Sequence, residues 1–531
     1  MPPAPTTPAT PPAAGDAAPR GFAWHRLAAV LRGLWAAIGP ARHPDSLPSR
    51  HKLARRIARR LARRARFERM EQRLEQRVGR IATRVQGWVA RVQVVGPGGR
   101  LSAAARHRLL AQAGSEGSEL LARHLALHAG AGRQPAALYS GNRVELLVDG
   151  PAAFEAMFAA IDAARDSIFL ESYIIEDAAI AQRLAALLLR KRAEGATVHV
   201  LFDAVGSLST ADTFFERLSE GGVAVCAFNP VNPLMRSGWL ERYRARRSAL
   251  THRDHRKILV VDSRVAFTGG INISEVYSAG SFGRHAAQQP PPLSSREGWR
   301  DTQVRIEGPA ALALEALVRE AWVSQGCGGM LPPAAARPDA QIAQAETAGD
   351  KLVAIVAATP QDRENRIYAT LLSAIDGARH SVHLTMAYFA PGQEMVGALC
   401  DAARRGVEVV LILPSVSDFA PVLHAGRSYY GTLLRAGVQV HELQHAVLHA
   451  KTAVIDGEFS TVGSSNMDWR SFTGNNEVNA IVIGAAFGAD MAAMFERDLR
   501  ASRQVTLADW QQRPWLQRAK ERAARAFETW W

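Results

Sequence analysis

The chain has 531 residues, 47% hydrophobic and 21% charged, which is typical of a folded protein with room for two or three domains. Its net charge is +14, but residues 1–134 hold 24 Lys and Arg against 7 Asp and Glu, so the remainder is slightly acidic. A groove that follows a nucleic-acid backbone should leave a basic excess, so this balance argues against a nucleic-acid substrate for the larger part.

The cysteines indicate a reducing compartment. Cys226, Cys327 and Cys400 are widely spaced, odd in number and without metal-ligand spacing. We therefore expect buried thiols and no disulfide framework. Residues 1–20 are mostly Pro, Ala and Thr, which predicts disorder, and they do not have the charged start and apolar run of a secretory signal peptide.

Residues 21–134 are predicted to form a basic, amphipathic helical region. The apolar stretch 21–39 is interrupted by Arg26 and Arg32, and fits either an interfacial helix or a short helix packed on the core. Residues 50–84 hold 14 Lys and Arg against three Glu, with paired arginines every four residues beside an apolar stripe. This pattern fits a helix on an anionic membrane, a solvated helical arm or a nucleic-acid-binding arm.

Residues 135–327 and 351–500 each alternate short apolar strands with helices, which predicts α/β units. The second unit repeats the first, because a strand that ends at Tyr173 returns as one that ends at Tyr388. Residues 328–350 are predicted to be the linker between the two halves.

The chain ends in a predicted basic, Trp-bearing helix over residues 501–531. Its aromatic and arginine side chains fit a membrane interface, and they fit packing on the core equally well.

Each half carries the same polar residues at the same spacing. A His is followed by a Lys two residues on, an Asp five beyond the Lys, a Gly seven further and an Asn three later. The first set is His255, Lys257, Asp262, Gly269 and Asn272, and the second is His449, Lys451, Asp456, Gly463 and Asn466.

These residue types suit a phosphate site. Side chains two apart on a strand share a face, so each His lies beside its Lys, and a pseudo-twofold axis would bring the two pairs together. Imidazole, ammonium and carboxamide groups can supply a nucleophile, a general acid and donors to a phosphate without a metal.

A carboxylate should hold the distal nitrogen of each imidazole, and Asp301 and Glu477, which follow the two motifs, are the candidates. Asp262 and Asp456 lie near a strand end. From the residues alone they fit either a catalytic role or a structural one at the strand-to-turn junction.

The motif pair resembles the phospholipase D superfamily, and the surrounding sequence is similar to that of bacterial cardiolipin synthases. The similar stretches include LESYIIED (170–177), HRDHRKILVVD (252–262) and HAKTAVIDGEFSTVGSSNMDWRSFTGNNEVN (449–479). The resemblance implies two duplicated phospholipase D-like α/β/α sandwich domains with mixed sheets that share one active site. The basic helical region would be an N-terminal extension.

The same resemblance implies a mechanism. His255 would attack a phosphatidyl phosphorus to give a phosphohistidine, and His449 would act as acid and base. The Lys and Asp of each motif (Lys257, Asp262, Lys451 and Asp456) would belong to the catalytic set, and Lys257, Lys451, Asn272 and Asn466 would hold the phosphate. Phosphatidylglycerol would be donor and acceptor, giving cardiolipin and glycerol, with no cofactor and no metal.

The sequence shows no transmembrane helix at its start, which makes it more similar to the shorter B-type synthase. We therefore expect a peripheral protein on the cytoplasmic side of the inner membrane, bound to anionic lipid through residues 21–84. Other lipid donors or alcohols remain open, as do hydrolysis of phospholipid, a nucleic-acid phosphodiesterase and a non-catalytic membrane scaffold.

Overall fold

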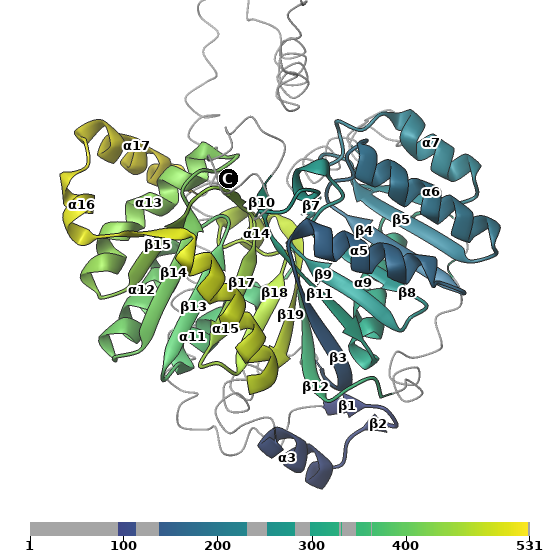
Figure 1. The fold of residues 1–531 in the computed structure, drawn as a ribbon, viewed down its shortest axis with the longest axis horizontal. Helices are drawn as coiled ribbons and strands as arrows, with labels where there is room; N and C mark the ends of the chain where they lie inside the picture. The colour runs from purple at the N-terminus through teal and green to yellow at the C-terminus, as the bar shows by residue number, and fades with distance from the viewer. Residues whose placement is uncertain are drawn as a thin grey trace, which may run out of the picture. The chain divides into compact units, whose positions relative to one another are not determined.

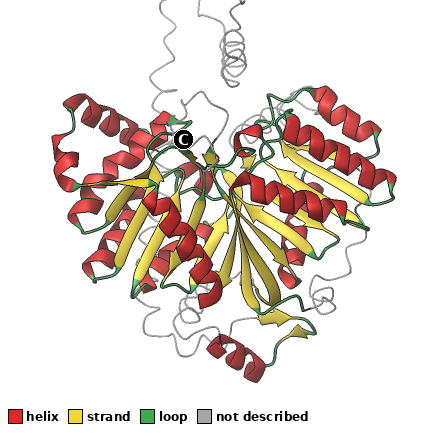
Figure 2. Cartoon of the chain, in the orientation of Figure 1, coloured by secondary structure: helices red, strands yellow, loops and turns green. Residues whose placement is uncertain are grey.

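The computed structural model describes residues 94–112, 137–230, 252–281, 298–328, 331, 347–362 and 364–528, all within the unit Arg63–Trp531. These residues form two α/β halves joined along one edge strand each (Figure 1). Strands fill the middle of both halves and helices lie outside them (Figure 2). The predicted fold class, two duplicated α/β/α halves with mixed sheets, is confirmed.

The first half alternates strands and helices up to the motif and then closes with antiparallel strands and a long helix. Its elements are β3 (Leu138–Val148), α5 (Asp149–Asp162), β4 (Ser167–Ser172), α6 (Ala179–Ala193), β5 (Thr197–Asp203), α7 (Asp212–Glu220), β6 (Ala224–Phe228), β7 (Arg253–Asp254), β8 (Ile258–Val261), β9 (Val265–Gly269), the 3-10 helix η4 (Glu275–Tyr277), β10 (Trp299–Arg300), β11 (Thr302–Glu307) and α9 (Pro309–Ser324).

The second half repeats this order and adds a C-terminal strand and two helices. Its elements are β12 (Lys351–Ala358), α11 (Arg366–Gly377), β13 (Ser381–Met386), α12 (Gly392–Arg404), β14 (Glu408–Pro414), α13 (Ala420–Arg435), β15 (Gln439–Leu443), β16 (Val447–Leu448), β17 (Lys451–Ile455), β18 (Phe459–Gly463), α14 (Trp469–Thr473), β19 (Asn475–Ile483), α15 (Ala485–Arg500), β20 (Ser502–Val505), α16 (Leu507–Gln512) and α17 (Trp515–Ala526).

The strand pairings show the duplication directly. Outward from the junction, the first half runs β3-β11-β9-β8-β4-β5-β6 and the second runs β12-β19-β18-β17-β13-β14-β15. The outer three strands of each half are parallel and the others antiparallel, and β3 pairs with β12 across the junction. The two orders match, so the halves are related by a pseudo-twofold axis between β3 and β12.

Apolar residues fill three layers. One cluster lies under α5, α6 and α7 in the first half, and a second lies under α11, α12 and α13 in the second half. A third is shared between the halves, where strand residues such as Val260 and Val454 meet α9 and α15. Because both faces of the central strands are covered, β8 and β17 are buried throughout, and they are apolar except for Lys451 and Thr452 at the start of β17.

The segment ahead of the first half differs from the helical region expected over residues 21–134. Val94–Gly96 (β1) pairs with Gly99–Arg100 (β2) in a hairpin, and Val94 lies opposite Leu138 of β3. The helix α3 (Ala103–Gln112) follows it. The basic stretch at 50–84 and the predicted disordered residues 1–20 lie outside the described residues.

Two cysteines form a disulfide, so the prediction of three buried thiols is wrong. Cys226 on β6 is bonded to Cys327, just beyond α9, with a Cα–Cα distance of 5.8 Å, and Cys400 is free and buried. The two partners are 101 residues apart, which is why the spacing gave no signal. Disulfides persist in oxidising compartments, so this pair removes the argument for a reducing one.

In the described part of the chain, no helix has both the length and the apolar character needed to cross a bilayer.

The disulfide makes a direct prediction about thiol content. The denatured, unreduced protein should react with one equivalent of a maleimide, at Cys400, and with three after reduction. Cys226→Ser should lower the free energy of unfolding by roughly 2–4 kcal/mol, because the bridge restricts the unfolded chain. Cys226→Ser with Cys327→Ser should cost no more than the single change. Three reactive thiols without reductant would show that the bond does not form.

Candidate active site

The two His-x-Lys motifs lie at the same edge of the molecule. Lys257 immediately precedes β8 and Lys451 begins β17, and both strands run antiparallel to their neighbours β4 and β13. The motifs therefore sit at the carboxyl ends of the parallel strands, where ligand sites form in α/β sheets. Both histidines and both lysines are buried.

Short parallel strand pairs bring each motif against the opposite half. β7 pairs with the start of β19, so that Arg253 lies opposite Asn475, and His255 N–H donates to the carbonyl of Asn476. In the same way β10 pairs with β16, and His449 N–H donates to the carbonyl of Arg300. Continuing either register by one step places a carboxylate beside a histidine.

The two candidate carboxylates occupy these positions. Nδ1 of His255 lies 3.0 Å from both carboxylate oxygens of Glu477, and Nδ1 of His449 lies 2.7 Å from Oδ2 of Asp301. Each carboxylate follows the motif of its own half in sequence but contacts the histidine of the other half. Sequence order alone would have paired them within a half.

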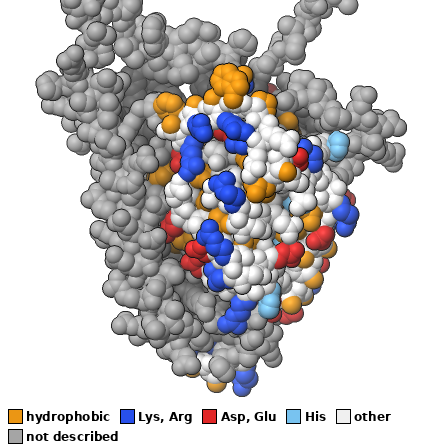
Figure 3. All heavy atoms as spheres, turned by 90° about the vertical axis from the view of Figure 1, so that its left-hand side faces the viewer, with side chains coloured by type: hydrophobic (Ala, Val, Ile, Leu, Met, Phe, Trp, Pro, Cys, Tyr) orange, Lys and Arg blue, Asp and Glu red, His pale blue; other side chains and the backbone are white. Residues whose placement is uncertain are grey.

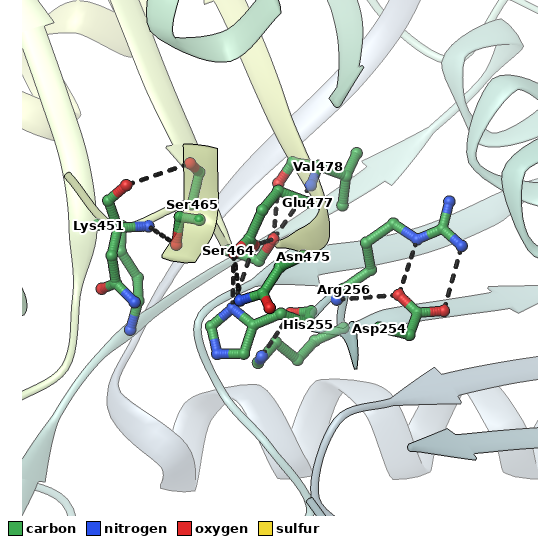
Figure 4. A network of polar contacts seen from close by, with 12 residues as sticks. Asp254, His255, Arg256, Lys451, Ser464, Ser465, Asn475, Glu477 and Val478 are labelled. Atoms are coloured by element: carbon green, nitrogen blue, oxygen red, sulfur yellow. Dashed lines mark hydrogen bonds and ion pairs between the residues drawn. The ribbon is translucent and has the colours of Figure 1, made fainter. Parts of the chain in front are cut away.

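Glu477 is held by further polar groups. The hydroxyl of Ser464 donates to Oε2 of Glu477 at 2.5 Å, and the amide of Asn475 lies 3.4 Å from Oε1. Figure 4 shows this carboxylate against the His255 ring, with Asp254 and Arg256 paired beside it. These bonds fix the carboxylate, which in turn fixes the imidazole orientation.

The asparagines are placed differently in the two halves. Asn272 accepts a hydrogen bond from the Ile174 N–H and lies 3.3 Å from the Tyr277 hydroxyl. Asn466 is also buried, and its side-chain oxygen has no hydrogen-bond partner among the residues that the structure describes.

Several contacts of the site were not found from the sequence. The Tyr277 hydroxyl lies 3.1 Å from Nδ1 of His449, and the Tyr173 ring lies edge-on to the His255 ring with centroids 4.9 Å apart. Behind the motif, Arg300 is buried and donates to both carboxylate oxygens of Asp498. Tyr173 carried a signal, because its strand end recurs at Tyr388, whereas Tyr277 has no repeated counterpart.

Burial shifts the protonation of the whole cluster. It lowers the pKa of His255 well below its usual value, and the nearby ammonium groups of Lys257 and Lys451 lower it further. Burial also lowers the pKa of His449, but Asp301 opposes that change. The pKa of Lys257 falls to about 7 and that of Lys451 to about 8, again chiefly through burial.

Glu477 shifts in the opposite direction, because burial raises its pKa to about 7. Burial therefore favours the neutral imidazoles in the free protein and weakens the charged forms of Lys257, Lys451 and Glu477. An arriving phosphate anion would favour the protonated forms of the lysines and of His449, because opposite charges at close range stabilise one another.

Asp262 and Asp456 lie away from the histidines. Each begins a tight turn at the end of its strand that is far from the Lys. The strand between them, β8 with four residues or β17 with five, separates the Asp from the Lys by about 15 Å. Both have a positive φ of 52°, and each is followed by a second positive-φ residue, as in the type I′ turn of a hairpin.

The carboxylates of these two aspartates bind backbone. Asp262 accepts from the N–H groups of Arg165, Asp166 and Ser167, and Asp456 accepts from the N–H groups of residues 379–381. These contacts join the strand end to the start of β4 or β13. The placement gives both residues a structural role instead of the catalytic one that the motif implied.

Within the described ranges, no group of three or more His, Cys, Asp or Glu side chains is arranged to hold a metal ion.

Asp262→Ala and Asp456→Ala should each lower the free energy of unfolding by about 1–3 kcal/mol, because three backbone donors lose their acceptor. At a temperature where the variants stay folded, kcat should remain close to that of the parent. Thermal unfolding and initial rates would test this together. A folded Asp262→Ala protein with no activity would restore the catalytic role.

A substitution at Gly270 can test the hydrogen bond between Asp301 and His449. A Cβ on Gly270 would lie 2.1 Å from Oδ1 of Asp301, so Gly270→Ser must displace this carboxylate from the imidazole. We expect kcat to fall about 10–100-fold with a nearly unchanged KM, as for loss of a group that orients a reactive imidazole.

Ser464→Gly is the matched change in the other half, because Ser464 occupies the equivalent position. It removes the hydroxyl bond to Glu477 without a clash, and it should reduce kcat less. Equal activity of folded Gly270→Ser and the parent protein would argue against a role for the Asp301 contact.

Comparison with known proteins agrees with this architecture. A family model described as "Cardiolipin synthase, PLD-like domain" matches residues 371–499. Cardiolipin synthase A of Pseudomonas aeruginosa (strain LESB58) is 36% identical over 386 residues, 73% of this chain and 73% of its own length. Cardiolipin synthase A of Pseudomonas putida (strain KT2440) is 34% identical over 396 residues, 74% of this chain and 75% of its own length.

A solved structure shares the fold. The crystal structure of phosphatidylserine synthase from Haemophilus influenzae Rd KW20 superposes with a TM-score of 0.52 at 12% identity, covering 73% of this chain and 95% of that one. Together with the curated relatives, this places both halves in the phospholipase D fold. The chain therefore belongs to the cardiolipin synthase family of the phospholipase D superfamily, and it is a phosphatidyltransferase.

Proposed function

We propose that the chain makes cardiolipin from two molecules of phosphatidylglycerol through a covalent phosphohistidine, and that glycerol leaves. The observation that carries the proposal is the pair of buried histidines, each held at Nδ1 by a carboxylate of the opposite half. This leaves Nε2 of each ring for chemistry and fixes which nitrogen reacts.

In the first step Nε2 of His255 attacks the phosphorus of one phosphatidylglycerol. The bond from phosphorus to the glycerol oxygen breaks, and protonated His449 gives its proton to that oxygen. In the second step neutral His449 takes the proton of a hydroxyl on a second phosphatidylglycerol. That oxygen attacks phosphorus, the bond from phosphorus to His255 breaks, and cardiolipin is released.

The electrostatics support this division of roles. Burial and two lysines lower the pKa of His255 strongly, which favours a neutral nucleophile. Asp301 partly restores the pKa of His449, which favours a group that exchanges a proton. Lys257, Lys451, Asn272 and Asn466 would hold the phosphate, since ammonium and carboxamide groups stabilise the charge that builds on its oxygens.

The substrate class also rests on the relatives, whose name states that they make cardiolipin. Transfer of the phosphatidyl group to water is the competing reaction of the same site. A nucleic-acid substrate is disfavoured because the part of the chain beyond residue 134 is slightly acidic. Phosphatidic acid as the main product would indicate hydrolysis.

We also propose that the protein acts at the surface of the inner membrane and that residues 21–84 contact anionic lipid. The cytoplasmic side was expected from the resemblance to the B-type synthase, and the Cys226–Cys327 disulfide removes the separate thiol argument for a reducing compartment. Deleting residues 50–84 should weaken binding to phosphatidylglycerol vesicles, and added salt should weaken binding of the intact chain.

A substrate with a good leaving group separates the two histidines. A phosphatidyl nitrophenol needs no proton at its leaving oxygen, so His449→Ala should release about one equivalent of nitrophenol and retain a covalent phosphatidyl group. His255→Ala should release none, and neither variant should make cardiolipin from phosphatidylglycerol.

The control is His441→Ala, a histidine of β15 outside the motifs, which should behave as the parent. Acid-quenched protein analysed by mass spectrometry would locate the adduct. A burst from His255→Ala with none from His449→Ala would reverse the assignment. Lipid mass spectrometry of a host that has no cardiolipin synthase of its own would test the product in cells.

A further inference from the structure

The C-terminal helix α17 is fixed to the second half by polar contacts. The Arg525 guanidinium lies 4.4 Å from the centre of the Tyr429 ring, and the Tyr429 hydroxyl donates to Glu528 at 2.6 Å. Glu521 is buried and pairs with Arg513 at 2.9 Å. The side of α17 that faces the protein is therefore largely charged.

The opposite side of the helix is apolar and faces outward. Trp515 is 77% exposed and Leu516 is 52% exposed, and three alanines on the same side are also exposed (Ala519, Ala523 and Ala526). A surface helix of a soluble protein normally turns its apolar stripe inward. In α17 the arrangement is reversed, so its apolar side is available to something outside this half.

Large exposed apolar side chains are rare elsewhere in the described ranges. The others are Phe527, at the end of α17, and Val323 on α9. Three of these four residues thus belong to one short segment. In the view of Figure 3, hydrophobic side chains stand at the top of the described face, with Lys and Arg side chains directly below them.

The charge on the outward side indicates what this surface contacts. Lys520 and Arg522 are exposed among the apolar residues, whereas Glu521, the one acidic residue of α17, is buried and paired. Basic residues beside Trp and Leu match an anionic bilayer, because the side chains reach acyl-chain depth while the cations meet lipid phosphates. A protein partner would not require this combination.

The helix is also attached to the edge of the molecule that holds the catalytic residues. Ala524 packs with Ala390 and Ala425, and Ala390 lies in the loop that follows β13. The preceding residue, Phe389, bridges to Met467, the neighbour of Asn466. Figure 1 shows α17 at the same edge as β7, β10 and α14.

We propose that α17 is a membrane-docking helix that inserts Trp515 and Leu516 into the headgroup region of an anionic bilayer. Lys520 and Arg522 then contact lipid phosphates, and the catalytic edge is held against the surface. This contact is separate from the one proposed for residues 21–84. It goes beyond the phosphatidyl transfer and does not depend on which lipid is converted.

Vesicle binding of the full-length protein tests the proposal, with Trp515→Ser/Leu516→Ser as the main variant. Vesicles of phosphatidylcholine with 30% phosphatidylglycerol would be sedimented at about 0.15 M and 0.5 M salt, since the higher salt screens the basic arm. The double variant should partition about tenfold more weakly at both salts, because the lost contact is apolar.

Two further variants make the result specific. Lys520→Glu/Arg522→Glu should weaken binding at low salt only, and only when phosphatidylglycerol is present. Val323→Ser removes an equally exposed apolar residue from α9, at 67% exposure, and should bind as the parent does. Turnover of phosphatidylglycerol in detergent micelles should be unchanged in all three, which separates docking from catalysis.

Parent-like sedimentation of folded Trp515→Ser/Leu516→Ser at both salts would overturn the proposal. A change from dimer to monomer in light scattering, with vesicle binding unchanged, would also overturn it and would identify α17 as an interface between copies of the chain. The binding readout needs no turnover, so it stands even if the protein does not make cardiolipin.

Discussion

The rest of the structure depends on one constraint, which is the hydrogen bond from each motif histidine to a carboxylate of the other half. His255 binds Glu477 and His449 binds Asp301, and both bonds cross the pseudo-twofold axis. Neither half can therefore orient its own imidazole. The β7–β19 and β10–β16 strand pairs align each histidine with its carboxylate, and each pair is only two residues long.

So short a backbone contact needs support from both halves. The buried Arg300 guanidinium binds Asp498 in the second half and lies 3.5 Å from Asp149 in the first, so it holds β10 from both sides. In the first half, Arg253 lies 3.3 Å from buried Asp203 and supports β7. Removing one partner from such a pair leaves a buried charge uncompensated, which costs several kcal/mol. The apolar cluster that both halves share also holds the two halves together, over a larger area than these ion pairs.

Burial of the site also sets its chemistry. Desolvation lowers the pKa of both imidazoles and of both lysines, and it raises the pKa of Glu477. Burial therefore disfavours the charged forms of these groups in the free site, and an entering anion would favour the protonated lysines and the protonated His449. The phosphodiester of a bound phospholipid is such an anion. Docking of α17 on a membrane, as proposed, would bring this lipid to the site.

The sequence by itself determined the duplication, the motif residues and the family. All three follow from local sequence patterns. A His and a Lys two residues apart on a strand lie on the same face, and two segments with the same motif spacing are expected to have the same fold. It also identified Asp301 and Glu477 as the carboxylates that orient the two imidazoles. It did not determine which histidine each serves, because sequence order does not record the strand pairing between halves. The Cys226–Cys327 bond lies within the first half, and it was hidden because its partners are 101 residues apart and only the fold brings them together. The fold also decided between the two roles open to Asp262, because it places that carboxylate on the backbone N–H groups of residues 165–167. The outward side of α17 also became clear only in the tertiary structure, because the amphipathic pattern does not say which side meets the protein.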